Sequence, residues 1–276
     1  MKRLQSIAAK RKNVVKSDDA VRPSGSQTLF RGLDVLEAVA RGISGLPELA
    51  DNLGLHKSTT YRLAAALVDR DYLRFTPGFG YTLGPKLLEL GATAHGGIDL
   101  VQVAKPFLMD LSARTSDAVH LGVYDNDTVL YLDKIPGTRR IVISSRVGER
   151  QPLHSTGVGK ALMLDMDEAR WRAVYKTETR SKDQVGLARW LRQMTDYAAK
   201  GYAFDLEENE DRIRCVSAAI RDASGGIVGS ISLSSAKQYM DDARMVLLIA
   251  DVKQTAEKIS RALGWNDVNH KKRNKS

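Results

Sequence analysis

Cysteine is almost absent from this chain: Cys215 is the only one in 276 residues. A single cysteine excludes an internal disulfide framework and fits a reducing cytoplasm. The chain also has no apolar run of about 18 residues, and its charged N-terminal segment lacks the apolar stretch that secretory signals carry. We therefore expect a cytoplasmic protein with no membrane span and no secretory signal.

A basic excess in the body of the chain is also missing, although the formal net charge is +9. Residues 1–25 hold seven Lys and Arg against two Asp, and the last seven residues add four basic side chains, so the part between is neutral overall. We expect a disordered basic arm over 1–25 and a basic tail over 267–276. Such ends can add salt-sensitive affinity for DNA phosphates or can simply aid solubility, and charge alone leaves both interpretations open.

The chain does contain enough material for two domains. Its length exceeds one average domain, and a hydrophobic content of 43% can build two cores. Apart from one short hairpin, helical periods dominate up to Thr115, and period-two runs of β-prone residues begin at Ala118. This change of period predicts an α+β protein with a helical N-terminal domain and a mixed C-terminal domain.

Residues 46–73 organise the N-terminal domain and predict two short helices joined by a turn at Gly54. Apolar residues recur at helical spacing, at Leu46, Leu49, Ala50 and Leu53 in the first helix and at Leu63, Ala64 and Leu67, with Thr60, in the second. The other face of the second helix has polar side chains within little more than one turn: Ser58, Thr59, Tyr61 and Arg62, with Lys57 beside them. Such a face suits insertion into a DNA major groove, although an ordinary helical hairpin has the same spacing.

Two flanking elements favour DNA binding over a plain helical hairpin. A helix that begins near Ser26 precedes the pair, and its predicted core stripe is Leu29, Leu33, Leu36 and Ala40. A β-hairpin is predicted over residues 72–83, around a Pro-Gly-Phe-Gly turn. Three helices followed by a hairpin make a winged helix-turn-helix, predicted over 26–84. In the wing, Arg74 contacts a DNA phosphate or is a solvated charge at the strand edge.

The rest of the chain is expected to form a linker helix over 85–99 and a C-terminal domain over 100–266. The helix that follows Asp99 contains Pro106, which predicts a kink or a break near Lys105. The domain then has two groups of three strand-like runs, with helices between and after them. The runs cover 118–125, 128–135, 139–147, 201–208, 212–222 and 226–235, and the helices cover 166–175, 185–200 and 241–263.

The first candidate site in this domain is a loop before a short helix. Its residues are Ser155, Thr156, Gly157, Val158 and Gly159. The spacing of the two glycines before Lys160 does not fit a phosphate-binding GxxxxGK[ST] loop, and Ala161 replaces the required hydroxyl. Hydroxyls and backbone N–H groups at a helix start attract a carboxylate, so a small organic acid is one candidate ligand. A plain helix cap is the alternative.

The second candidate site lies around Cys215. Its acidic neighbours are Asp205, Glu207, Glu208 and Glu210. With His154 they could bind a metal, but the chain lacks paired CxxC or HxxxH spacing. A nucleophilic Cys215 would need an activating base, whereas its apolar strand favours a buried, unreactive thiol. Ser232 and Ser234 project to one face of their strand, which suits the wall of a ligand pocket or the wet side of a sheet.

Six segments together resemble the IclR family of bacterial transcriptional regulators, across almost the whole chain. They are SQTLFRGLDVLEAVA, ELADNLGLHKSTTYRL, YTLGPKLLELG, PLHSTGVGKALM, GYAFDLEENEDRIRCVSAAIRD and GSISLSS. The resemblance implies a winged-helix domain, a C-terminal effector domain with a GAF/PAS-like fold, and dimers or dimers of dimers on operator DNA. In the family, the positions that line the effector pocket match Ser155 to Gly159, Asp205, Ile213, Cys215, Ser232 and Ser234. This chain departs from the family at Arg212, where members usually have a glycine.

We therefore expect a sequence-specific, DNA-binding transcriptional regulator of a catabolic operon, with repression favoured over activation. Its effector would be a small carboxylate such as a sugar acid or keto acid, and no cofactor is expected. Two other classes remain open at this point. One is an enzyme that modifies a small molecule with Cys215 or Asp205, and the other is a protein-interaction module with a vestigial DNA-binding domain.

Overall fold

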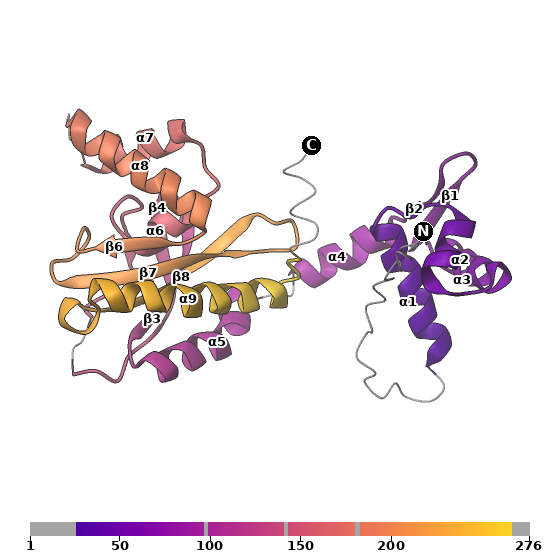
Figure 1. Ribbon diagram of the computed structural model, residues 1–276, viewed down its shortest axis with the longest axis horizontal. Helices are drawn as coiled ribbons and strands as arrows, with labels where there is room; N and C mark the ends of the chain where they lie inside the picture. Colours follow the sequence, from indigo (N-terminus) through magenta and orange to yellow (C-terminus); the bar gives the residue numbers. More distant parts are fainter. Residues whose placement is uncertain (1–25, 97–98, 141–142, 180–182, 267–276) are drawn as a thin grey trace, which may run out of the picture. The chain divides into compact units, whose positions relative to one another are not determined.

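The computed structural model describes residues 26–96, 99–140, 143–179 and 183–266 (Figure 1). The predicted basic arm over 1–25 and tail over 267–276 lie outside these residues. The chain forms two compact units, residues 1–97 and 98–276, which we describe separately. No helix of the described residues is long and apolar enough to cross a membrane. The predicted two-domain α+β architecture is confirmed.

Unit 1 is a winged helix-turn-helix. Its elements are α1 (Gln27–Ala40), α2 (Leu46–Leu53), α3 (Lys57–Asp69), β1 (Leu73–Thr76), β2 (Gly80–Leu83) and α4 (Lys86–Gly96). Gly54 ends α2 with a φ of 62°, a left-handed conformation that glycine adopts without strain, and this permits the turn into α3. The two strands form an antiparallel hairpin in which Leu73 pairs with Leu83.

The core of unit 1 uses a different face of α1 from the predicted one. Val35, Ala38 and Val39 are buried, whereas the side chains of Leu29 and Leu33 are 65% and 46% exposed. The prediction of a core stripe through Leu29 and Leu33 is therefore wrong. Two apolar stripes at helical spacing share this helix, and its packing against α2, α3 and β2 decides which stripe is covered.

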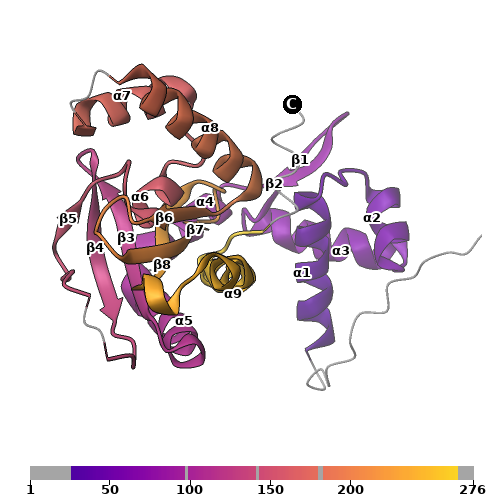
Figure 2. The same ribbon diagram turned by 60° about the vertical axis from the view of Figure 1, so that its left-hand side comes forward.

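Unit 2 is one antiparallel sheet with helices on both faces (Figures 1 and 2). Its strands are β3 (Ala118–Asp125), β4 (Thr128–Ile135), β5 (Arg150–Gln151), β6 (Ala203–Leu206), β7 (Ile213–Arg221) and β8 (Ile227–Ala236). They lie in the order β5-β4-β3-β8-β7-β6. The helices are α5 (Leu100–Thr115), α6 (Gly157–Leu162), α7 (Glu168–Thr179), α8 (Gln184–Lys200) and α9 (Asp242–Ala262), with a short 3-10 turn at Lys237–Tyr239.

Two hydrophobic cores lie on the two faces of this sheet. Leu108 of α5 and Val252 of α9 belong to the core on one face, together with Val216 and Leu233 of the sheet. Val158 of α6 and the side chains of α7 and α8 form the core on the other face. Figure 2 shows α5 and α9 together on one side and α6, α7 and α8 on the other. This layered sheet is the expected GAF/PAS-like arrangement.

Two local predictions in unit 2 differ from the structure: a break of the helix near Lys105 and a strand over 139–147. Helix α5 runs without a break through Pro106, and it begins after Asp99, whose carboxylate accepts hydrogen bonds from the backbone of Val101 and Gln102. The described residues of 139–147 form no strand, and β5 at Arg150–Gln151 pairs with β4 instead. The Nζ of Lys134 donates to the carbonyls of Ile143 and Ser145 at 2.6 and 2.7 Å, so a side chain rather than a neighbouring strand satisfies these two backbone groups.

Candidate functional site

The exposed face of α3 carries the predicted DNA-contacting side chains. Ser58 and Arg62 are exposed, the Tyr61 side chain is 57% exposed, and Thr59 is half-buried. Thr60 faces inward, and its hydroxyl donates to the carbonyl of His56 at 3.2 Å. The helical period thus places the polar residues on one accessible face of α3. The opposite face, with Thr60 and Ala64, is buried in unit 1.

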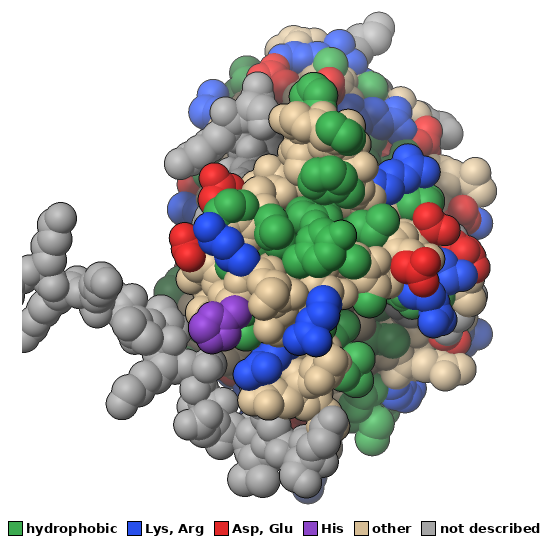
Figure 3. Space-filling model, turned by 90° about the vertical axis from the view of Figure 1, so that its right-hand side faces the viewer, with side chains coloured by type: hydrophobic (Ala, Val, Ile, Leu, Met, Phe, Trp, Pro, Cys, Tyr) green, Lys and Arg blue, Asp and Glu red, His purple; other side chains and the backbone are tan. Residues whose placement is uncertain are grey.

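Basic side chains at this end of unit 1 lie around an apolar centre. Figure 3 views the molecule from the right-hand side of Figure 1, where α2 and α3 lie, and shows Lys and Arg side chains, with some Asp and Glu, around that centre. Lys57 is exposed at the start of α3, and within the described ranges no carboxylate lies within ion-pair distance of it or of Arg62. In the wing, Arg74 is exposed opposite Thr82, and it is the only basic residue of the hairpin sequence. These donors are available to a partner.

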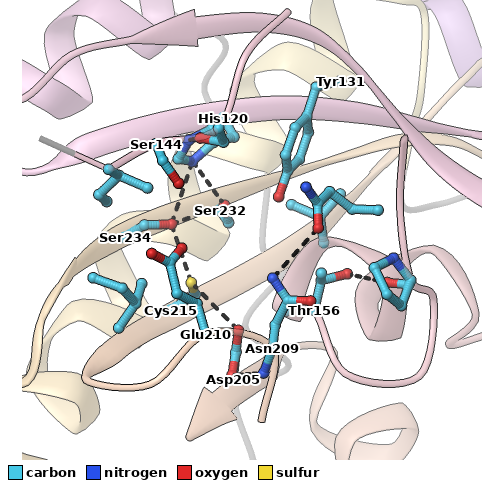
Figure 4. A pocket seen from close by; sticks show the side chains of 17 residues that line it. His120, Tyr131, Ser144, Thr156, Asp205, Asn209, Glu210, Cys215, Ser232 and Ser234 are labelled. Atoms are coloured by element: carbon cyan, nitrogen blue, oxygen red, sulfur yellow. Dashed lines mark hydrogen bonds between the residues drawn. The ribbon is translucent and has the colours of Figure 1, made fainter. Parts of the chain in front are cut away.

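A cavity of about 330 Å³ lies between the sheet of unit 2 and the start of α6 (Figure 4). Eight of the ten predicted effector residues line it: Thr156, Gly157, Val158, Asp205, Ile213, Cys215, Ser232 and Ser234. Strand pairing brings them together, because Ser234 is opposite Cys215 and Cys215 is opposite Asp205 in the register of β8, β7 and β6. Residues far apart in sequence therefore form one row across the sheet.

Ser155 and Gly159 do not line the cavity. The Ser155 hydroxyl donates to Oδ1 of Asn209 at 3.2 Å, which ties the loop to the end of β6. A Cβ on Gly159 would lie 2.4 Å from the carbonyl oxygen of Leu153, so glycine is needed for close packing there. Thr156 caps α6, because its hydroxyl accepts from the Gly159 N–H at 2.9 Å and donates to the Pro152 carbonyl at 2.6 Å.

His120, which no sequence pattern indicated, lines the same cavity from β3. The residue is 2% exposed and its ring stacks on Tyr131 at 5.1 Å. Its Nε2 lies 2.8 Å from the Ser145 hydroxyl, and its Nδ1 lies 3.4 and 3.3 Å from the hydroxyls of Ser232 and Ser234. Burial, with a smaller contribution from Lys134, lowers the pKa of His120 to about 3, so the ring is neutral at physiological pH.

Other lining residues were also missed. They are Tyr131, Ile143, Ser144, Ser145, Gln151, Pro152 and Asn209; Glu210, which also lines the cavity, was named only as an acidic neighbour of Cys215. No local pattern marks them, because all except Tyr131 come from the end of the short strand β5 or from segments without helix or strand structure. The pairing of β3 with β8, which places His120 opposite Ser232, is the information that would have identified the histidine.

The thiol of Cys215 is unsuited to nucleophilic catalysis. It is buried, and it accepts a hydrogen bond from the Ser234 hydroxyl at 3.1 Å. Burial, together with the charge of Asp205, raises the pKa of the Cys215 thiol well above its ordinary value, so the thiolate is disfavoured. His120 contacts Ser234 rather than the sulfur. The hypothesis of a buried, unreactive cysteine fits this geometry.

The acidic residues around Asp205 do not converge on a metal site. Glu207 pairs with Arg214 and Lys237, and Glu208 pairs with Lys160. Within the ranges that the structure describes, no three His, Cys, Asp or Glu side chains are grouped for metal binding. The carboxylates serve instead to hold the loop after β6 and the side chain of the buried Lys160, which also donates to the Phe204 carbonyl at 2.8 Å.

Asp205 is the buried carboxyl of the cavity. It is 2% exposed, and its Oδ1 accepts from the backbone N–H of Glu208 at 2.9 Å. Burial raises the pKa of Asp205 to about 6, and the charge of Lys160 opposes this rise. The carboxylate is therefore ionised near neutral pH at a cost in desolvation.

We expect Asp205→Asn to stabilise unit 2 above pH 6 by a few degrees and to leave it unchanged below pH 4. The unfolded chain loses this proton near 3.8 and the folded protein near 6, so ionisation destabilises the fold as pH rises through that window. The amide oxygen of Asn can still accept from Glu208. The lowered pKa of His120 makes the folded protein less stable as the pH falls, which is the opposite trend. This contribution is the same in the variant and the parent, so it cancels in the difference between their thermal midpoints. Thermal melts from pH 4 to pH 8 measure the difference, and equal midpoints at pH 8 would contradict it.

A winged helix-turn-helix in the same chain as a layered sheet domain that contains a cavity is typical of a transcriptional regulator. Two family models match the chain. Residues 28–77 match the IclR helix-turn-helix domain, and residues 92–261 match the bacterial transcriptional regulator IclR C-terminal domain. The chain belongs to the IclR family of transcriptional regulators. It is a regulator and not an enzyme.

Relatives with known names support this assignment. The regulator XynR of Escherichia coli is 33% identical over 87% of this chain and 98% of its own length. KdgR of the same organism is 29% identical over 89% of this chain and 96% of its own length. The crystal structure of the Agobacterium tumefaciens repressor BlcR has the same fold, with a TM-score of 0.75 and 24% identity, and covers 89% of this chain and 100% of that one.

Proposed function

We propose that this regulator represses a catabolic operon and releases its operator when a small carboxylate, a sugar acid or keto acid, binds in the cavity of unit 2. Residues 26–84 would read the DNA, 85–99 would link the domains, and 100–266 would bind the effector. The observation that carries the proposal is the cavity of about 330 Å³ in a DNA-binding regulator, since ligand pockets have volumes of about 300–1,000 Å³. Several relatives are named as repressors, among them AllR of Escherichia coli.

DNA recognition would rest on few side chains. Ser58, Thr59, Tyr61 and Arg62 are assigned to the groove, and Lys57 and Arg74 to phosphates. Residues 26–90 contain seven basic and seven acidic side chains, so bulk charge does not attract DNA to this domain. DNA binding by this domain would depend on these hydrogen-bond donors, on the basic arm and on pairing of two chains.

Pairing as a homodimer or a dimer of dimers forms part of the proposal. Symmetric half-sites of DNA are read by two copies of a helix-turn-helix. The exposed side chains of Leu29 and Leu33 on α1 and of Leu88 on α4 are apolar surface that a second copy could cover. We also place the protein in the cytoplasm, because operator DNA is found there and the single cysteine would stay reduced there.

The test is binding of the full-length protein to the DNA upstream of its own gene, measured by fluorescence anisotropy. We expect specific binding that weakens with salt. A screen of sugar acids and keto acids should then find a compound that raises the thermal midpoint and lowers the affinity for DNA. Absence of any preference for this DNA over a scrambled duplex would refute the proposal, and a full thermal response of Asp205→Ala to the compound would refute the pocket assignment.

A further inference from the structure

The cavity of unit 2 has an unusual charge balance for an acid-binding site. Its lining includes no Lys or Arg among the described residues, while Asp205 and Glu210 contribute two carboxyl groups. The buried Lys160 is occupied by Glu208 and by the Phe204 carbonyl. Lys134 is likewise occupied by the carbonyls of Ile143 and Ser145. A carboxylate in the depth of this cavity would meet like charge and no opposite charge.

Hydroxyl groups, by contrast, match what the cavity offers. We call His120, Asp205, Cys215, Ser232 and Ser234 the polar floor. Ser232 and Ser234 lie 3.2 Å apart and both approach Nδ1 of His120, and Ser234 donates to Cys215. Figure 4 shows this hydrogen-bonded string on one side of the cavity and Thr156 on the other. A serine hydroxyl, a neutral imidazole and a carboxylate together present donors and acceptors to a group that can do both, and an alcohol is such a group.

We propose that the polar floor recognises hydroxyl groups, so that the effector is a polyhydroxylated molecule rather than a keto acid or an aromatic acid. This inference rests on the proposed function, because it names the chemistry of the same site. The hydroxyl-bearing carbon chain lies on the floor, and any carboxylate of the effector lies away from Asp205. His120 determines specificity by holding the two serines in place as a neutral ring.

Buried polar groups give such a floor its selectivity. A hydroxyl group can exchange hydrogen bonds with such a floor, whereas a ligand without hydroxyls displaces its water and gives no hydrogen bond in return. The floor is buried, since His120, Asp205, Ser232 and Ser234 are each at most 3% exposed. An alkanoate with the same number of carbons as the effector would therefore be rejected, because it has a carboxylate but no hydroxyl groups.

The test compares three pools of probes on the full-length protein by thermal shift and calorimetry. They are the five- and six-carbon aldonates, the matching alditols, and the unsubstituted alkanoates of the same lengths. We expect a shift from at least one of the two hydroxylated pools and none from the alkanoates. Ser232→Ala, Ser234→Ala and His120→Phe, which keeps a ring against Tyr131, should each weaken binding of the active pool by about tenfold. Ser235→Ala, on the other face of β8, is the matched control and should bind as the parent does.

The outcomes separate this inference from the proposed function. A shift from the alkanoates that equals the shift from the aldonates, no shift from either hydroxylated pool, or unchanged affinity in both serine variants would overturn the hydroxyl-binding floor. Specific binding to the upstream DNA would leave the regulator proposal standing in each of those cases. Loss of that DNA binding in the parent protein would refute the regulator proposal, whatever the probes do.

Discussion

Arg62→Ala is expected to reduce affinity for the operator by about 5- to 150-fold, because one bidentate base contact contributes about 1–3 kcal/mol. Arg62 lies on the exposed face of α3, and its neighbour Thr60 holds the helix from the buried side. Removing an exposed side chain with no partner in the described part of unit 1 should leave the fold intact. Footprinting and anisotropy on operator and scrambled DNA measure the loss, and circular dichroism checks the fold.

Arg70→Ala is the matched control, since Arg70 is an exposed arginine at the end of the same helix. It should bind the operator nearly as the parent does. The salt dependence identifies the role of Arg62: a base contact changes specificity, whereas a phosphate contact weakens all sequences alike and lowers the salt slope by about one. A footprint of Arg62→Ala identical to that of the parent would exclude either role.

Gly159→Ala is expected to destabilise unit 2 by about 3 kcal/mol, the upper range for overpacking. The new Cβ would lie 2.4 and 2.5 Å from the carbonyl oxygen and Cα of Leu153, and both are backbone atoms that cannot rotate away. Relief requires α6 to move from the loop that precedes it, and this movement displaces Thr156, Gly157 and Val158 from the cavity wall. A fall of about 6–12 °C in the midpoint of unit 2 follows for a unit of this size, and the response to effector should be lost with it.

Gly226→Ala provides the comparison within the same unit. A Cβ there would lie 3.3 Å from the Ser224 hydroxyl and 3.9 Å from Oδ1 of Asp222, both of them side-chain atoms, so little change in midpoint is expected. Differential scanning calorimetry follows unit 2 in both variants. Equal midpoints for Gly159→Ala and the parent would show that α6 does not pack on Leu153 as the structure has it.

The sequence was sufficient for the DNA-binding unit because its signals are local. Gly54 between two apolar periods, the polar turn of α3 and the Pro-Gly turn of the wing each act within a few residues, and the helices and hairpin formed where these patterns predicted them. The same local reasoning failed on α1, where two apolar stripes compete. Only contacts with α2, α3 and β2 bury Val35 and leave Leu29 exposed.

The candidate effector site divides in the same way. The loop before α6 and the serine pair of β8 were found because their motifs are contiguous, and the resemblance to a family added Asp205, Ile213 and Cys215. His120 was not found, since its place opposite Ser232 depends on pairing between strands more than 100 residues apart. The predicted strand over 139–147 was wrong as well: among its described residues, the carbonyls of Ile143 and Ser145 accept hydrogen bonds from Lys134, a contact that no local pattern marks.

The sequence by itself thus determined the two domains, the recognition helix and eight of the seventeen residues that line the cavity, through short-range patterns and the family resemblance. The tertiary structure decided which face of α1 is buried, brought His120 onto the cavity floor and left the lining without a cation. Those features depend on strand register and on which charged side chains find partners, and both are set by contacts between segments that are distant in the chain.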